Sequence, residues 1–258
     1  MAEAGVTVLM AARDVARGEA AARELSQAGL TVEAIEMNLN REETIPVAAK
    51  AILDRHGRLD ILVNNAGIVD PEDGPPSAAT VAAARRLMET NFLGTLAVTQ
   101  AMLPLLLKSS AGRIVNLATT LGSLSINSDP TSPYYEARLI GYNASKAALN
   151  MLTVQLAAEL KGTSIVVNSV APGYVKTGLT GGKGYMTPAE GARLPSNMLC
   201  SAKRRLQASL SPPKALSPGS GGSCGPANAG PKQISVPTSG NNVLYWTLSG
   251  IRNISIGP

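Results

Sequence analysis

The sequence is poor in the side chains from which many catalytic sites are built. It contains one histidine, His56, and two cysteines, Cys200 and Cys224, and aromatic residues make up only 3% of its 258 residues. With a single histidine and no cysteine before position 200, neither a conventional zinc site nor a nucleophilic triad based on histidine can be assembled. The two cysteines are interpreted as free thiols. Any chemistry must therefore come from other side chains.

Long apolar runs are also missing. The longest one, Ala101–Leu107, is far too short to span a bilayer. The first residues, Met1–Ala4, include an acidic residue and lack the basic residues that open a secretory signal. We therefore expect a cytoplasmic protein without a membrane partner. At 45% apolar residues, the chain is still rich enough in hydrophobic side chains for one sizeable core.

Acidic residues are absent from the last part of the chain. Residues 1–190 hold all 18 acidic residues, whereas residues 191–258 contain 7 basic residues and no acidic one. Within that part, residues 211–230 consist mainly of Ser, Pro, Gly and Ala, which bury too little apolar surface to offset the loss of chain entropy. We therefore predict a domain over 1–192 and a basic, disordered tail over 193–258. Without an aromatic stripe, that tail gives little reason to expect a nucleic-acid partner.

Between residue 5 and about residue 170, short apolar runs alternate with longer amphipathic ones at a period of roughly thirty residues. The runs predict strands at 6–11, 31–37, 59–63, 113–117 and 164–170. The amphipathic stretches predict helices at 14–29, 42–56, 80–107 and 142–160. Consecutive parallel strands joined by helices form a doubly wound α/β sheet, which binds its ligands beyond the carboxyl ends of the strands.

A tyrosine and a lysine lie four residues apart at the start of the last predicted helix. This spacing puts Tyr142 and Lys146 on one helix face, about one turn from each other. A nearby ammonium favours phenolate over phenol, so the pair predicts a lowered tyrosine pKa and a usable general acid or base. The alternative is a surface lysine beside a packed tyrosine.

Further motifs accompany this pair in a fixed order. Two asparagines and a glycine end the buried strand at 62–67, Asn91 lies within the long helix, and Asn116 precedes a run of hydroxyl side chains. Pro172 and Gly173 follow the last clear strand. In order and spacing these motifs resemble the short-chain dehydrogenase/reductase family over roughly residues 1–190. The resemblance implies a Rossmann-like fold and an oxidoreductase.

The resemblance also implies catalytic roles for individual residues. Tyr142 matches the proton donor for carbonyl reduction, and Lys146 matches the residue that lowers the tyrosine pKa and holds the nicotinamide ribose. Asn91 is similar to the asparagine that holds a water in a proton relay toward the lysine.

The serine that binds the substrate oxygen in the family is replaced here by Thr119, three residues after Asn116. Threonine supplies the same hydroxyl donor, but its methyl group stiffens the rotamer and crowds the oxygen site. We therefore expect an effect on rate rather than on mechanism. Ser123 and Ser125 are alternative donors, although we favour a role for them as polar loop residues.

Two arginines follow the first predicted strand, where relatives that prefer NAD carry an acidic residue. Arg13 and Arg17 can share a 2′-phosphate, so the resemblance implies NADPH as the cofactor. The alternative is a pair of solvated arginines at a helix start. The other positions that the resemblance assigns to cofactor binding, besides Tyr142 and Lys146, are Asn38, Leu39, Asn64, Val175 and Thr177.

The start of the chain departs from the family. Relatives begin with a strand and a Gly-x-x-x-Gly-x-Gly turn that binds the pyrophosphate, and neither precedes residues 6–11 here. Because that strand is central in the family's sheet, we expect a five-stranded, incompletely closed sheet, a loose tail and weakened NADPH binding. Only residues 242–250 have the strand character to fill the gap, and their insertion is the alternative.

These observations lead to two functional hypotheses. The first is an NADPH-dependent reductase of a small ketone or aldehyde, in which Tyr142 donates the proton. The second is a catalytically impaired or inactive remnant of the fold that serves as a binding or oligomerisation module. The resemblance further suggests a homo-oligomer formed through the helices at 80–107 and 142–160.

Overall fold

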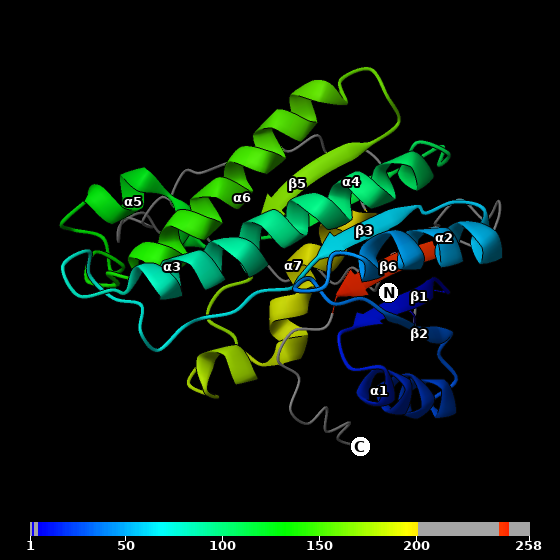
Figure 1. Cartoon of the computed structure of the whole chain (residues 1–258), viewed down its shortest axis with the longest axis horizontal. Coiled ribbons are helices and arrows are strands. Elements are labelled where there is room, and N and C mark those ends of the chain that lie inside the picture. Colours follow the sequence, from blue (N-terminus) through cyan, green and yellow to red (C-terminus); the bar gives the residue numbers. More distant parts are fainter. Residues whose placement is uncertain (1, 3–4, 201–242, 248–258) are drawn as a thin grey trace, which may run out of the picture.

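The computed structural model describes residues 2, 5–200 and 243–247, and its centre is a parallel sheet of six strands (Figure 1). The strand order is β2-β1-β6-β3-β4-β5. The strands are β1 (Thr7–Ala12), β2 (Val32–Glu36), β3 (Ile61–Asn64), β4 (Arg113–Leu117), β5 (Val166–Val170) and β6 (Val243–Thr247). The α-helices are α1 (Val15–Gln27), α2 (Thr44–His56), α3 (Val81–Met88), α4 (Gly94–Leu106), α5 (Leu124–Ser128), α6 (Ile140–Glu159) and α7 (Pro188–Cys200).

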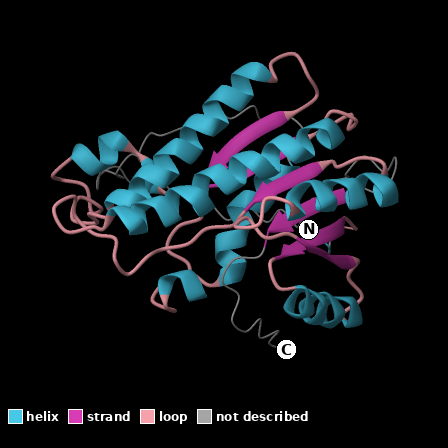
Figure 2. Ribbon diagram, in the orientation of Figure 1, coloured by secondary structure: helices cyan, strands magenta, loops and turns pink. Residues whose placement is uncertain are grey.

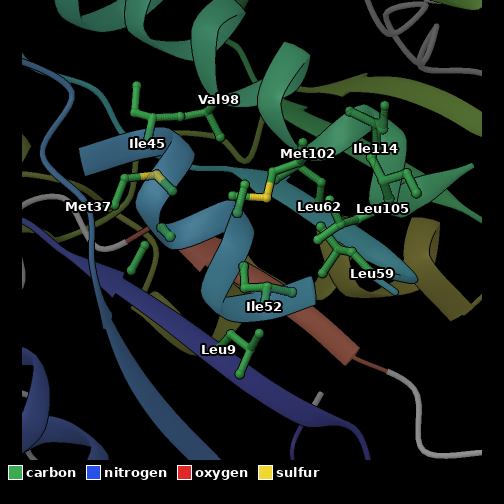
Figure 3. Packing of buried hydrophobic residues seen from close by; sticks show 14 of the residues in the cluster. Leu9, Met37, Ile45, Ile52, Leu59, Leu62, Val98, Met102, Leu105 and Ile114 are labelled. Atoms are coloured by element: carbon green, nitrogen blue, oxygen red, sulfur yellow. The ribbon is translucent and has the colours of Figure 1, made fainter. Parts of the chain in front are cut away.

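Helices cover both faces of the sheet, as the predicted doubly wound α/β fold requires (Figure 2). On one face, side chains from α2, α4 and α6 pack against Leu9, Leu62 and Ile114 of the strands (Figure 3). On the other face, α1 and α7 pack on side chains that include Met10 and Val63. The side chains on both faces of the strands are apolar, which suits a sheet whose two faces are covered by helices.

Helix α1 begins where its sequence predicts. The side chain of Asp14 accepts a hydrogen bond from the backbone N–H of Arg17 at 3.1 Å, so this residue caps the helix as expected. The cap orients the start of α1 at the carboxyl end of β1. Both arginines predicted to bind the cofactor therefore lie at that edge of the sheet.

The single long helix expected at 80–107 is interrupted. Residues Glu89–Leu93 form a π-helical turn between α3 and α4, and Asn91 lies in its middle. Such a turn contains one extra residue per hydrogen-bonded ring and is frequent at functional sites. The helical periodicity on either side continues across it, which is why the sequence predicts one uninterrupted helix.

The expectation of a five-stranded sheet is wrong. Strand β6 lies between β1 and β3 and pairs with both in parallel, with Leu244 opposite Val8 on one side and opposite Ile61 on the other (Figure 1). The alternative, insertion of the late apolar run, is therefore the observed arrangement. An empty position would leave two rows of backbone donors and acceptors unpaired, and a strand in that position pairs both rows.

Regular structure also continues past the predicted boundary at residue 192, because α7 extends to Cys200. Its start has a capping box: the Thr187 hydroxyl accepts from the Glu190 N–H, and the Glu190 carboxylate accepts from the Thr187 N–H. Leu199 packs into the core beside Val63. The rest of the segment expected to be disordered, residues 201–242 and 248–258, lies outside the described residues.

Candidate active site

Tyr142 and Lys146 lie one turn apart on α6, beside the carboxyl end of β4. The Lys146 side chain is buried, and its Nζ atom donates a hydrogen bond of 2.8 Å to the carbonyl oxygen of Leu117. The same Nζ atom lies 6.0 Å from the centroid of the Tyr142 ring. A buried lysine that makes a hydrogen bond to the end of a strand is not the surface lysine of the alternative interpretation.

The expected lowering of the tyrosine pKa is not found. Burial raises the pKa of Tyr142 to about 12, and burial lowers the pKa of Lys146 to about 8. Both shifts have the same cause, since removal from water disfavours the charged form of each group. The prediction considered only the charge of the lysine. In the structure desolvation dominates, and the Lys146 N–H group points to the Leu117 carbonyl.

Asn91 connects the loop after β3 to the tyrosine helix. Its side chain is fully buried, accepts from the N–H of Ile68 at 2.8 Å and donates to the carbonyl oxygen of Ile68 at 3.1 Å. Its Nδ2 atom also donates to Ser145 Oγ, which in turn donates to the carbonyl oxygen of Tyr142. The side chain therefore holds two backbone segments together. The relay water that the resemblance assigns to this residue stays a prediction.

Thr119 lies just beyond β4 and caps the 3₁₀ turn at Thr120–Gly122, where its hydroxyl accepts from Leu121 N–H at 3.3 Å. Within the described ranges, no hydrogen bond joins the hydroxyls of Thr119 and Tyr142. The alternative donor Ser123 is buried and caps α5, where its Oγ atom accepts from the Ile126 N–H. That local role agrees with the expectation for a polar loop residue.

Two glycines allow neighbouring loops to pass close to Lys146. A Cβ atom at Gly122 would lie 2.9 Å from the carbonyl carbon of Lys146, so the loop packs directly on the helix backbone. A Cβ atom at Gly67 would lie 3.4 Å from Lys146 Nζ and 3.6 Å from Asn91 Oδ1. The missing side chain at Gly67 thus lets the segment after β3 pass close to both polar groups.

The residues predicted to bind the rest of the cofactor lie on loops at the same edge. Arg13 and Arg17 are exposed at the end of β1 and in the first turn of α1. Asn38 follows β2 and accepts from the Asn40 N–H, and Leu39 packs toward Gly94 of α4.

The last two of these residues, Val175 and Thr177, belong to the loop after β5. Val175 forms a bridge with Met186, and the Thr177 N–H donates to the hydroxyl of Thr180. That hydroxyl also donates to the carbonyl oxygen of Val175. The loop is therefore fixed by its own hydrogen bonds.

Asn64 is the last residue of β3, and its side chain is buried. Its Nδ2 atom donates to Asn116 Oδ1 at 2.8 Å and to Thr99 Oγ1 at 3.1 Å, and the Asn116 amide donates to Thr153. All four side chains are buried. This network braces β3 against β4, α4 and α6, and it fixes the position of the segment 65–67 that follows.

Within the described ranges, no group of three or more His, Cys, Asp or Glu side chains could hold a metal ion. In the same ranges, no helix is both long and apolar enough to cross a membrane.

Comparison with known proteins agrees with the fold and the arrangement of motifs. The profile of the short chain dehydrogenase family matches residues 1–186. The short-chain dehydrogenase anuI of Penicillium roqueforti is 38% identical over 191 residues, which cover 72% of this chain and 75% of that protein. The NADPH carbonyl reductase 1 of Macaca fascicularis is 29% identical over 223 residues, which cover 73% of this chain and 79% of that protein.

Among solved structures, a gluconate 5-dehydrogenase of Burkholderia cenocepacia in complex with NADP and tartrate matches with a TM-score of 0.60 and 28% identity. The match covers 69% of this chain and 65% of that one. The chain therefore belongs to the short-chain dehydrogenase family of oxidoreductases, which use a nicotinamide cofactor, and has the Rossmann-like fold of that family.

Proposed function

We propose that this protein reduces the carbonyl group of a small ketone or aldehyde with NADPH. The observation that carries the proposal is the pair on α6, in which the buried Lys146 Nζ lies 6.0 Å from the Tyr142 ring beside the ends of β3 and β4. A phenol whose pKa burial raises to about 12 stays protonated at neutral pH. The phenol therefore holds the proton that a carbonyl oxygen accepts once negative charge develops on it.

When bound, NADPH would supply the hydride that the carbonyl carbon accepts. Tyr142 donates its phenolic proton to the oxygen as negative charge develops there, and the hydroxyl of Thr119 donates a hydrogen bond to the same oxygen. Lys146 would hold the nicotinamide ribose and would supply a positive charge near the phenolate that forms. Asn91 holds the segment around Ile68 against α6, so that the lysine and the segment keep their relative position.

We infer NADPH rather than NADH from the charge at the end of β1. Arg13 and Arg17 are exposed there, and the guanidinium group binds phosphate oxygens in a two-pronged geometry. Asn38, Leu39, Val175 and Thr177 would contact the adenine and carboxamide ends, and Asn64 would act by fixing the strand end. The gluconate 5-dehydrogenase with NADP and the NADPH carbonyl reductase support this choice.

A specific observation favours the second candidate, an impaired or inactive protein. Strand β6 takes the central position in the sheet, and the sequence that follows it, residues 251–257, has no Gly-x-x-x-Gly-x-Gly spacing. The backbone amides that would bind the pyrophosphate therefore have to come from elsewhere. This candidate predicts a fold that binds NADPH weakly and turns over slowly or not at all.

The decisive experiment compares the wild-type protein with Tyr142→Phe. We expect wild-type protein to oxidise NADPH in the presence of a small aldehyde or ketone, and we expect the variant to bind NADPH equally well without turnover. Tyr134→Phe, an exposed tyrosine in a loop, is the matched control and keeps the activity. Wild-type NADPH binding without turnover would support the impaired protein, and turnover by Tyr142→Phe would refute the role of the phenol.

We also propose that copies of the chain associate through α4 and α6. The side chains of Met151 and Val154 on α6 are about half exposed, and so is Leu107, the residue that follows α4. A second copy that covers these residues would remove apolar surface from water. Met151→Glu should shift the protein toward the monomer in analytical ultracentrifugation, and an unchanged sedimentation coefficient would count against this interface.

A further inference from the structure

Helix α6 begins without a cap from its own sequence. The first N–H groups of any α-helix have no partner within the helix, and a polar side chain at the N-cap position normally accepts from one of them. Here that position is occupied by Leu139, whose side chain has no oxygen. The helix that carries Tyr142 in its first turn therefore needs hydrogen-bond acceptors from another part of the chain.

These acceptors come from the loop after β3, almost 70 residues earlier in the chain. Asp73 Oδ1 accepts from the backbone N–H of Gly141, and Asp73 Oδ2 accepts from the backbone N–H of Tyr142, each at 2.9 Å. The neighbouring carbonyl oxygen of Gly74 accepts from the N–H of Ile140 at 3.0 Å. One carboxylate thus binds the tyrosine's own backbone and the residue before it, with its charge at the positive end of the helix dipole.

The close approach of the carboxylate depends on the missing side chain of Gly141. A Cβ atom at this position would lie 2.7 Å from Leu87 Cδ1 of α3 and 3.2 Å from Asp73 Oδ1. A residue with a side chain would push the helix start away from both. The sequence therefore provides both the carboxylate and the space for it, at two sites far apart in the chain.

The loop that carries Asp73 is itself held in place. Arg86 of α3 forms ion pairs with Asp70 at 2.7 Å and with Glu72 at 2.8 Å. These hydrogen bonds from Arg86 hold the pKa of the Asp70 carboxyl below its usual range, so the ion pair persists at neutral pH. At the start of this loop, the Asn91 side chain makes hydrogen bonds with the N–H and the carbonyl oxygen of Ile68. The segment 68–74 is therefore fixed at its two ends, against the π turn and against α6.

We infer that Asp73 is a positioning residue for Tyr142. It fixes the first turn of α6 relative to the loop 68–74 and the π turn, and it thereby sets where the phenol lies with respect to the ends of β3 and β4. This inference rests on the proposed function for its catalytic consequence, because only a reacting phenol needs such a fixed position. The contacts themselves belong to the structure whether or not the protein is active.

The test compares three variants. Asp73→Ala removes both acceptors, and Asp73→Asn keeps one oxygen acceptor and loses the other. Asp129→Ala is the matched control, because Asp129 also accepts two side-chain hydrogen bonds within a loop, both from Thr131 rather than from α6. Thermal unfolding of each variant shows first that it is folded.

Two readouts are independent of activity. Hydrogen exchange at the amides of Gly141 and Tyr142 should be about tenfold faster in Asp73→Ala than in wild type, and intermediate in Asp73→Asn. The ring resonances of Tyr142 in protein labelled at tyrosine, assigned with Tyr142→Phe, should shift in Asp73→Ala and not in Asp129→Ala. Unchanged exchange or an unchanged ring signal in a folded Asp73→Ala protein would overturn the inference, even if the wild-type protein reduces no substrate.

Kinetics then test the catalytic consequence. In Asp73→Ala we expect kcat to fall by about ten- to a hundredfold with the KM for NADPH nearly unchanged, because a small displacement of the proton donor slows the chemical step. The solvent isotope effect on kcat should increase, with Asp73→Asn again intermediate. A loss of rate that only follows the folded fraction, with an unchanged isotope effect, would show a structural cap alone and overturn the positioning role.

Discussion

Lys146 Nζ donates a hydrogen bond of 2.8 Å to the carbonyl oxygen of Leu117, and this bond ties α6 to the end of β4. The same hydrogen bond takes the ammonium group out of water and directs it toward the strand end. Partial burial of the tyrosine and full burial of the lysine shift the two pKa values, and the lysine's shift can be measured through the pH dependence of stability.

The free energy of unfolding should depend on Lys146 between pH 8 and 10.5. Burial lowers the pKa of this lysine from its usual 10.5 to about 8, so the unfolded chain binds more protons in this range and stability rises with pH. Lys146→Met lacks this contribution, and its stability relative to wild type should fall by about 1–3 kcal/mol from pH 8 to pH 10.5. Urea unfolding at several pH values measures the difference. The exposed Lys161→Met is the control, and parallel pH curves for wild type and Lys146→Met would contradict the prediction.

Replacement of Arg13 should change the choice of cofactor. Arg13→Ala is expected to weaken NADPH binding by about ten- to a hundredfold, the range of one or two charge-assisted hydrogen bonds, and to leave NADH binding unchanged. Fluorescence titration of each nicotinamide gives the two Kd values. Arg23→Ala, on an exposed part of α1, is the matched control. An equal loss of affinity for both cofactors would show that Arg13 does not bind the 2′-phosphate.

Asn64 should contribute more to stability than to binding. Asn64→Ala leaves the buried acceptor Asn116 Oδ1 without its partner, and an unsatisfied buried polar group costs about 1–3 kcal/mol. We expect a loss of this size in denaturant unfolding, while the variant, when folded, binds NADPH with an affinity close to that of wild type. Asn40→Ala is the exposed control. A large loss of affinity without loss of stability would instead assign Asn64 to the cofactor site.

The central strand can be tested through its backbone. Tyr245 lies opposite Leu9 of β1 and opposite Leu62 of β3, in the middle of both ladders. Tyr245→Pro should destabilise the protein by about 3 kcal/mol or more, because proline removes a donor and does not fit a central strand. Ser239→Pro, before the strand, serves as control. Amide protection at 243–247 in hydrogen exchange provides a second measurement, and rapid exchange there would contradict the observed pairing.

Local signals in the sequence were sufficient for the five strands between residues 5 and 170 and for most of the helices, but not for the π turn at Glu89–Leu93 or for α5. These signals act through neighbours in the chain: the Asp14 cap, the apolar runs of the strands, and the four-residue spacing of Tyr142 and Lys146. Helix caps and the periodicity of helices and strands follow from local backbone geometry, which does not depend on the fold. The capping box at Thr187 and Glu190 is a signal of this kind as well. It indicates the start of α7, for which hydrophobic periodicity gives no signal.

What the tertiary structure decided depends on partners far apart in the chain. Whether β6 occupies the centre of the sheet depends on open backbone groups of β1 and β3, which no local pattern encodes. The cap that Asp73 gives to Tyr142 is formed across 69 residues. The raised pKa of the tyrosine follows from burial among side chains that are not its neighbours in sequence. The sequence by itself therefore determined the family and the order of the first five strands, because motifs and periodicity are local. The tertiary structure decided strand pairing, desolvation and the position of the phenol, because these energies arise only when distant segments come together.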